Sequence, residues 1–173
     1  MRGQYGAPCS QELKRKVLEA CYQPDDVLVM GFTAEERDRY ERFKNLFPDA
    51  LAPLIEHGLD KSDCLAMVER AGIEIPAMYR LGYENANCIG CVKGGEGYWN
   101  KIRRDFPDQF EELAQVQDEI GPGAYLFYNR KTGERFSLRD LDPNAGRHNE
   151  PVPECSFFCQ MAEQEYDRGR EDE

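Results

Sequence analysis

The feature that most constrains this chain is a set of two cysteine pairs placed far apart in the sequence. Two residues separate Cys88 from Cys91, and three residues separate Cys155 from Cys159. Two cysteines at the first spacing can bind one ion, because the turn between them brings both sulfur atoms to the same side. Four thiolates together suit tetrahedral zinc or an iron–sulfur cluster. Such a centre would tie the last part of the chain back onto the region near residue 88.

The cysteines also allow other interpretations. A thioredoxin-type redox pair would follow a strand, and residues 73–87 do not have a strand pattern. The second pair can be incidental, and Cys9 can replace one of its members in a cluster, because a helix start just after Cys9 would favour the thiolate. Our prediction is a shared zinc or [4Fe–4S] site whose ligands are Cys88, Cys91, Cys155 and Cys159.

Composition and charge exclude several classes of protein. The 173 residues include 33 acidic and 22 basic ones, and the net charge of −11 disfavours broad contact with nucleic-acid phosphates. No stretch approaches the roughly 20 apolar residues of a membrane span, and the N-terminal residues lack the apolar segment of a secretory signal. We therefore expect a cytoplasmic protein that binds neither membranes nor nucleic acids directly, in a compartment where disulfides are rare. The acidic stretch 162–173 is expected to be a solvated tail.

Residues 26–72 alternate between strand and helix patterns. The segment "DVLVMGF" at 26–32 is a near-continuous apolar run, typical of a strand buried on both faces. A short second strand is expected at 50–55, where Pro53 favours an edge or a bulge. This alternation implies parallel strands with right-handed crossovers. Because a doubly wound sheet normally has about five or six strands, residues 1–75 are predicted to be a partial α/β unit.

Helix-start signals support this alternation. Thr33 and Glu36 form a capping box for one helix, and Asp60 can cap another that ends at Gly72. An earlier helix can begin at Ser10. Residues expected to face the core of these helices include Leu13, Val17, Cys21 and Cys64.

The alternation of strand and helix patterns ends at about residue 75. A loop leads into the first cysteine pair, and "EGYWNKIRRD" at 96–105 is predicted to be helical. Asp105 can cap a second helix with Pro107 in its first turn, and residues 124–138 have the pattern of a β-hairpin. We therefore expect a cysteine-rich, metal-binding region of helix and hairpin over 76–161.

Four basic residues are candidates for contact with an anion. Lys14 and Arg15 lie on the first predicted helix, where a solvated face is the alternative to a phosphate or sulfate contact. Lys93 begins the stretch "KGGEG" at 93–97, whose glycine amides can cradle an anion or form a plain turn. The fourth residue, Arg39, becomes a candidate through the resemblance that follows.

Three motifs together resemble the phosphoadenosine phosphosulfate (PAPS) reductase family, in its phage and bacterial PAPS-reductase-like branch. They are "CSQELK" at 9–14, "GFTAEE" at 31–36 and "NCIGC" at 87–91, within a resemblance that spans about residues 5 to 160. The resemblance implies a Rossmann-like, adenine nucleotide α-hydrolase fold. Relatives reduce adenylyl sulfate compounds or activate a substrate with ATP for sulfur transfer, and several hold a four-cysteine iron–sulfur cluster.

The resemblance also suggests roles for single residues. Cys88 and Cys91 match the family's C-x-x-C, and Arg39 matches a basic position after the central strand. Lys14 and Arg15 match basic residues that face the anionic groups of the nucleotide. The nucleotide-contact candidates are therefore Lys14, Arg15, Arg39 and Lys93. The family's Ser-Gly-Gly-x-Asp-Ser phosphate loop is missing from the sequence.

Three functions follow from these expectations. The first is a PAPS-reductase-like protein with a four-cysteine metal site that is not a self-sufficient reductase; if active, it is an oxidoreductase or sulfurtransferase that needs a separate protein to supply the N-terminal half. The second is an acidic, phage-encoded inhibitor that binds a host defence or nucleic-acid-binding complex. The third is a zinc-stapled structural module.

Overall fold

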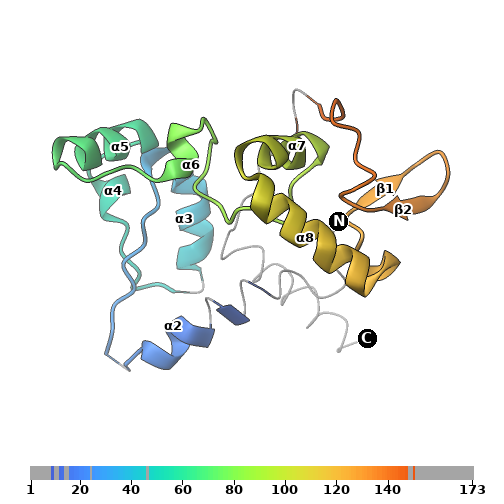
Figure 1. The fold of residues 1–173 in the computed structure, drawn as a ribbon. Coiled ribbons are helices and arrows are strands. Elements are labelled where there is room, and N and C mark those ends of the chain that lie inside the picture. Colours follow the sequence, from blue (N-terminus) through green and yellow to red (C-terminus); the bar gives the residue numbers. More distant parts are fainter. Residues whose placement is uncertain are drawn as a thin grey trace, which may run out of the picture. The chain divides into compact units, whose positions relative to one another are not determined.

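The chain combines many short helices with very little strand. A computed structural model describes residues 9, 12–13, 16–23, 25–45, 47–147 and 150 (Figure 1). These residues form two compact units: an N-terminal unit up to Ile75 and a C-terminal unit from Pro76. The predicted mixture of helix and strand is confirmed. No helix in this part of the chain is long and apolar enough to cross a membrane.

The N-terminal unit is mostly helical. Its elements are α2 (Lys16–Cys21), η2 (Ala34–Glu36), α3 (Arg37–Lys44), α4 (Pro53–Glu56) and α5 (Lys61–Arg70). The predicted capping box forms, since the Thr33 N–H donates to Glu36 Oε2 at 3.2 Å. Asp60 is the predicted N-cap of α5, and its Oδ1 accepts from the Asp63 N–H at 2.8 Å. Both predicted helix starts are confirmed. They could be predicted from the sequence because a cap depends only on neighbouring residues.

The two apolar segments of this unit pair in parallel, but only at one point. Val29 and Leu51 form a parallel bridge, with 2.8 Å hydrogen bonds from Met30 N to Leu51 O and from Leu51 N to Leu28 O. The expected second strand over 50–55 is wrong, because Pro53 begins α4 instead. Proline has no N–H for a ladder, and its fixed φ suits the first position of a helix. The first segment is also not buried on both faces, since Val29 is 64% exposed.

A small aromatic core holds the N-terminal unit together. It consists of Phe32, Tyr40, Phe43, Ala50, Ala52 and Ile55. The Tyr40 hydroxyl donates to Ala50 O at 2.7 Å, which ties α3 to the segment before α4. The predicted burial of Leu13, Val17 and Cys21 is wrong, because all three are exposed and Leu13 is 75% exposed. Cys64 is half-buried on α5.

The C-terminal unit pairs two helices with a hairpin. Its elements are α6 (Ala77–Arg80), α7 (Glu96–Asp105), α8 (Pro107–Ile120), η3 (Pro122–Ala124), β1 (Phe127–Asn129) and β2 (Glu134–Phe136). The predicted helix 96–105 and the predicted hairpin are confirmed, and Phe127 lies opposite Phe136 in the antiparallel register. Asp105, however, ends α7 and does not cap α8. Phe106 is the N-cap and Pro107 the first helical residue, which needs no N–H partner.

Polar clamps attach the hairpin region to the helix pair. The buried Gln117 side chain donates to Ala124 O at 3.0 Å and accepts from the Leu138 N–H at 2.8 Å. Arg103 Nη2 donates to Leu138 O and to Leu141 O, both at 3.0 Å. The core beneath these clamps consists of Met78, Tyr83, Trp99, Ile102, Phe110, Ala114, Phe127, Leu138 and Leu141.

Candidate metal centre

The first cysteine pair lies in a tight loop over the helix pair, which we call the cysteine loop (residues 88–94). Gly90 turns this loop with a φ of 73°, in the left-handed region that favours glycine. A Cβ at position 90 would overlap Leu113 Cδ1 and lie 3.1 Å from Trp99 Cη2. Glycine is therefore favoured at position 90 both by the turn and by the close approach to α7 and α8.

The Tyr98 side chain of α7 fixes the backbone of the cysteine loop. Its hydroxyl donates to Cys88 O at 2.9 Å and accepts from the Cys91 N–H at 3.1 Å. Gly94 lets the ring reach this position, because a Cβ there would overlap the Tyr98 ring. The Gly94 N–H donates to Cys91 O at 2.9 Å and closes the loop. The backbone of the cysteine pair is thus fixed by hydrogen bonds that involve no sulfur atom.

The Tyr98 hydroxyl is influenced by both cysteines of the loop. Burial raises the pKa of the Tyr98 hydroxyl, and the Cys91 and Cys88 thiols, which are negative when ionised, raise this pKa further. Cys88 is exposed and Cys91 is half-buried, so both remain close to the surface. The two-residue spacing of these cysteines is the spacing found in half of many tetrahedral zinc or iron–sulfur sites.

A second feature lies at the other end of Tyr98, at the start of α7. The Glu150 carboxylate accepts hydrogen bonds from Gly97 N at 2.9 Å, Tyr98 N at 3.2 Å and Arg147 N at 2.9 Å. A Cβ at Gly95 would lie only 2.6 Å from Glu150 Oε2. Of the glycine amides in 93–97 that were considered as an anion cradle, that of Gly97 therefore binds a carboxylate of the chain itself, while that of Gly94 donates to Cys91 O. This charge complements the positive end of the α7 dipole.

Tyr98 consequently connects the cysteine loop to the segment that leads to the second cysteine pair. Its hydroxyl bonds to the loop, while its backbone N–H bonds to Glu150, five residues before Cys155. Five extended residues can span about 17 Å, which is more than the length of one tyrosine. Cys155 itself lies outside the described residues.

The other predicted site residues are spread over the molecule. Arg39 lies on α3 of the N-terminal unit and forms an ion pair with Glu36, whereas Lys93 is exposed in the cysteine loop. Lys14, Arg15, Cys155 and Cys159 lie outside the described residues. Within the described residues, no group of three or more cysteine, histidine or acidic side chains converges as a metal site. No disulfide joins any of the five described cysteines.

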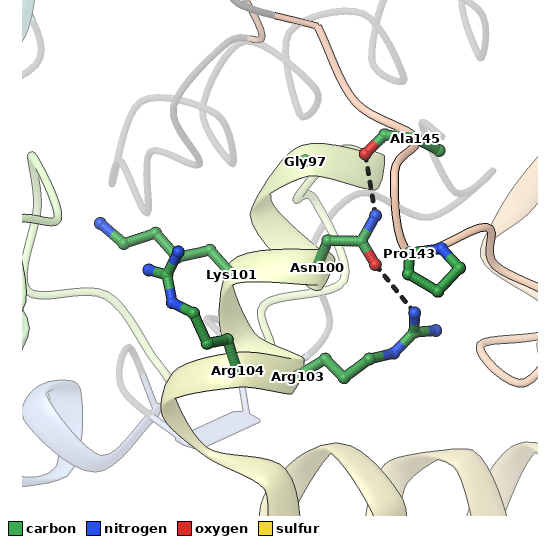
Figure 2. A pocket seen from close by; sticks show the side chains of 7 residues that line it. All are labelled: Gly97, Asn100, Lys101, Arg103, Arg104, Pro143 and Ala145. Carbon is green, nitrogen blue, oxygen red and sulfur yellow. Dashed lines mark hydrogen bonds between the residues drawn. The ribbon is translucent and has the colours of Figure 1, made fainter.

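A basic pocket of about 420 Å³ lies along α7 (Figure 2). It is lined by Gly97, Asn100, Lys101, Arg103, Arg104, Pro143 and Ala145. Figure 2 shows Asn100 and Arg103 on one side of the helix, with Lys101 and Arg104 extending to the other. Asn100 Nδ2 donates to Asp142 O and Ala145 O, both at 2.8 Å, and so attaches the loop that forms the second wall.

The cations of this pocket already have structural partners. Lys101 Nζ donates to Gly82 O at 2.6 Å and lies 3.7 Å from the centre of the Tyr83 ring. Arg104 Nε pairs with Asp105 at 2.7 Å, and Arg103 clamps the segment after the hairpin. An incoming anion would have to compete with these contacts. The pocket is therefore better explained as a set of structural clamps than as a ligand site.

Sequence reasoning missed the two residues that organise the cysteine loop. Glu150 has no local signal, because its partners at 97 and 98 are far away in the sequence. Tyr98 had an indirect signal, since the glycines of 94–97 leave room for a ring and a carboxylate. Comparison with known proteins adds no further information: no family model, no curated protein and no solved structure matches this chain.

Proposed function

We propose that the chain is a metal-binding protein in which Cys88, Cys91, Cys155 and Cys159 hold one zinc ion or one [4Fe–4S] cluster. The observation that carries this proposal is the double role of Tyr98. One end of the residue bonds to the cysteine loop, and the other bonds to Glu150, shortly before the second pair. The cysteine loop and Glu150 are thus both attached to the first turn of α7, which supports a centre shared by the two pairs, although 63 residues lie between Cys91 and Cys155.

The metal would act first as a structural staple. Within the first pair, the metal would close only the short loop between Cys88 and Cys91. By joining the first pair to the second, it would also close a loop of more than sixty residues that contains α7, α8 and the hairpin. Structural metal sites supply folding free energy, because the unfolded chain has no preformed site. The small core of this unit, with nine buried apolar residues in the part of the chain that the structure describes, would benefit from such a cross-link.

We also propose that the chain is PAPS-reductase-like and acts with a protein partner. The parallel pairing of Val29 with Leu51, with α3 in the connection, supports an α/β origin of the N-terminal unit. The sequence has no Ser-Gly-Gly-x-Asp-Ser loop, and Arg39 is ion-paired with Glu36. Nucleotide binding by this chain alone is therefore not part of the proposal. A clear calorimetric signal with ATP or PAPS, without a partner, would overturn this view.

Metal analysis of freshly purified, untagged protein tests the proposed centre. One zinc per chain in a colourless protein supports a zinc staple, and a brown protein with iron and sulfide supports a cluster. Cys91→Ala should lose the metal and lower the melting temperature of the C-terminal unit by many degrees. The matched control is Cys21→Ala, an exposed cysteine of the N-terminal unit. Wild-type protein without metal, or equal melting curves for both variants, would refute the proposal.

A further inference from the structure

We propose that the first turn of α7 is the template on which the metal centre is assembled, and that Tyr98 and Glu150 are its positioning residues. Tyr98 fixes the backbone of the first cysteine pair, and Glu150 fixes the start of the segment that carries the second pair. This inference rests on the four-cysteine centre proposed above. It assigns a role to two residues that are not themselves metal ligands.

The contacts of Tyr98 hold the loop in one shape before any metal binds. The hydroxyl donates to Cys88 O and accepts from the Cys91 N–H, so it connects the two ends of the C-x-x-C turn directly. The ring itself is held by edge contacts with Trp99 and Tyr83, at centroid distances of 6.1 and 6.2 Å. A preorganised loop loses less conformational freedom on binding, which raises metal affinity.

The contacts of Glu150 provide a second fixed point on the same turn. Its Oε1 accepts from Gly97 N at 3.0 Å and from Arg147 N at 2.9 Å, while Oε2 accepts from Gly97 N and Tyr98 N. Both oxygens are therefore occupied by amide hydrogens. This arrangement favours an anchor over a metal ligand, because ligation would need these oxygens to leave the helix start.

The chain around Glu150 is shaped for this contact. Gly146 approaches so closely that a Cβ there would lie 2.6 Å from Gly97 Cα. A Cβ at Gly97 would itself lie 3.0 Å from Glu150 Oε2. Glycine at these two positions therefore allows the segment before the second cysteine pair to run directly over the first turn of α7.

Zinc affinity of the full chain tests the template. The metal-free protein is titrated with Zn²⁺ against a competing chelator for wild type, Tyr98→Phe and Glu150→Gln. Each variant is expected to bind zinc about 10-fold more weakly, the lower end of the effect seen when an outer partner of a metal ligand is removed. The matched controls are Tyr128→Phe, at a tyrosine that is 57% exposed on the hairpin, and Glu119→Gln on the exposed face of α8.

Cobalt spectra separate positioning from ligation. If Tyr98 and Glu150 only position the ligands, Co²⁺-loaded variants keep the charge-transfer and d–d bands of the wild-type protein. Changed bands would mean a changed ligand set and would overturn the assignment of a positioning role. Wild-type protein that binds neither zinc nor an iron–sulfur cluster would overturn the proposed centre. Tight zinc binding by wild type, with Tyr98→Phe and Glu150→Gln equal to their controls, would overturn the template alone.

A measurement on the metal-free protein tests the Tyr98 contact without any metal. The Cys91 amide donates to the Tyr98 hydroxyl, so Tyr98→Phe should speed its hydrogen exchange roughly fivefold, as expected for the loss of one hydrogen bond. Tyr128→Phe should leave this exchange rate unchanged. Equal Cys91 exchange rates in wild type and Tyr98→Phe would refute the template even if the zinc affinity changed.

Discussion

Replacing Gly90 by alanine is the sharpest test of the packing beneath the cysteine loop. The left-handed backbone at this position, with φ of 73°, costs an alanine roughly 1–2 kcal/mol. The new methyl group would overlap Leu113 and press on Trp99, and overpacking of this kind costs about 1–3 kcal/mol. The two costs together predict a loss of about 2–5 kcal/mol in the free energy of unfolding.

Tryptophan fluorescence during heating is the appropriate assay, because Trp99 is the chain's only tryptophan and is buried in the C-terminal unit. For a unit of this size, a loss of 2 kcal/mol or more lowers the melting temperature by at least roughly 8 °C. Gly133→Ala is the matched control, since Gly133 has a φ of 78° but a Cβ there meets only Tyr128 Oη, at 3.8 Å. Gly133→Ala therefore incurs the cost of the left-handed backbone but not the cost of a steric overlap with buried side chains. A Gly90→Ala variant no less stable than Gly133→Ala would refute the packing argument.

Three further predictions concern the ionisation of Tyr83 and Asp105 and the aromatic core of the N-terminal unit. Burial and the neighbouring Asp105 carboxylate raise the pKa of the Tyr83 hydroxyl, so the native state keeps its proton longer than the unfolded chain. Stability should therefore fall as pH rises above about 10, and Tyr83→Phe should remove part of that fall in pH-dependent melting curves. The Arg104 side chain, with help from Tyr83, lowers the pKa of Asp105, so its contribution is present above about pH 4 and is lost in acid. Asp105→Asn should accordingly destabilise the protein at neutral pH but not in strong acid, and an equal loss at both pH values would contradict this. Phe43→Ala should cost about 3–5 kcal/mol in chemical denaturation, because its side chain is 1% exposed, whereas Val29→Ala should change stability by less than about 0.5 kcal/mol.

Local signals explain which elements were predictable from the sequence. The Thr33–Glu36 box and the Asp60 cap act within four residues, so neither depends on distant packing. The hairpin around Gly133 and the helix 96–105 are equally local. The error at Asp105 arose where two signals compete, because a proline at the first helical position makes a side-chain cap unnecessary.

Predictions that depended on contacts between distant segments of the chain were less successful. The spacing of Leu13, Val17 and Cys21 indicates an apolar helix face, but the pattern does not say whether any element covers it. In the same way, the apolar run 26–32 and the segment 50–55 were expected to be full strands. They meet in a single bridge, because Pro53 turns the second segment into α4 immediately after Leu51.

The sequence by itself determined the helix caps, the hairpin, the parallel direction of the two apolar segments and the presence of two cysteine pairs, because each depends on residue type and short spacing. Only the tertiary structure decided what holds the first pair in place. Tyr98 and Glu150 meet at the start of α7 from positions 52 residues apart, and the close approach at the glycines 94, 95 and 97 is explained only by these two neighbours. Contacts of this kind depend on how distant segments pack, and no local pattern in the chain encodes that packing.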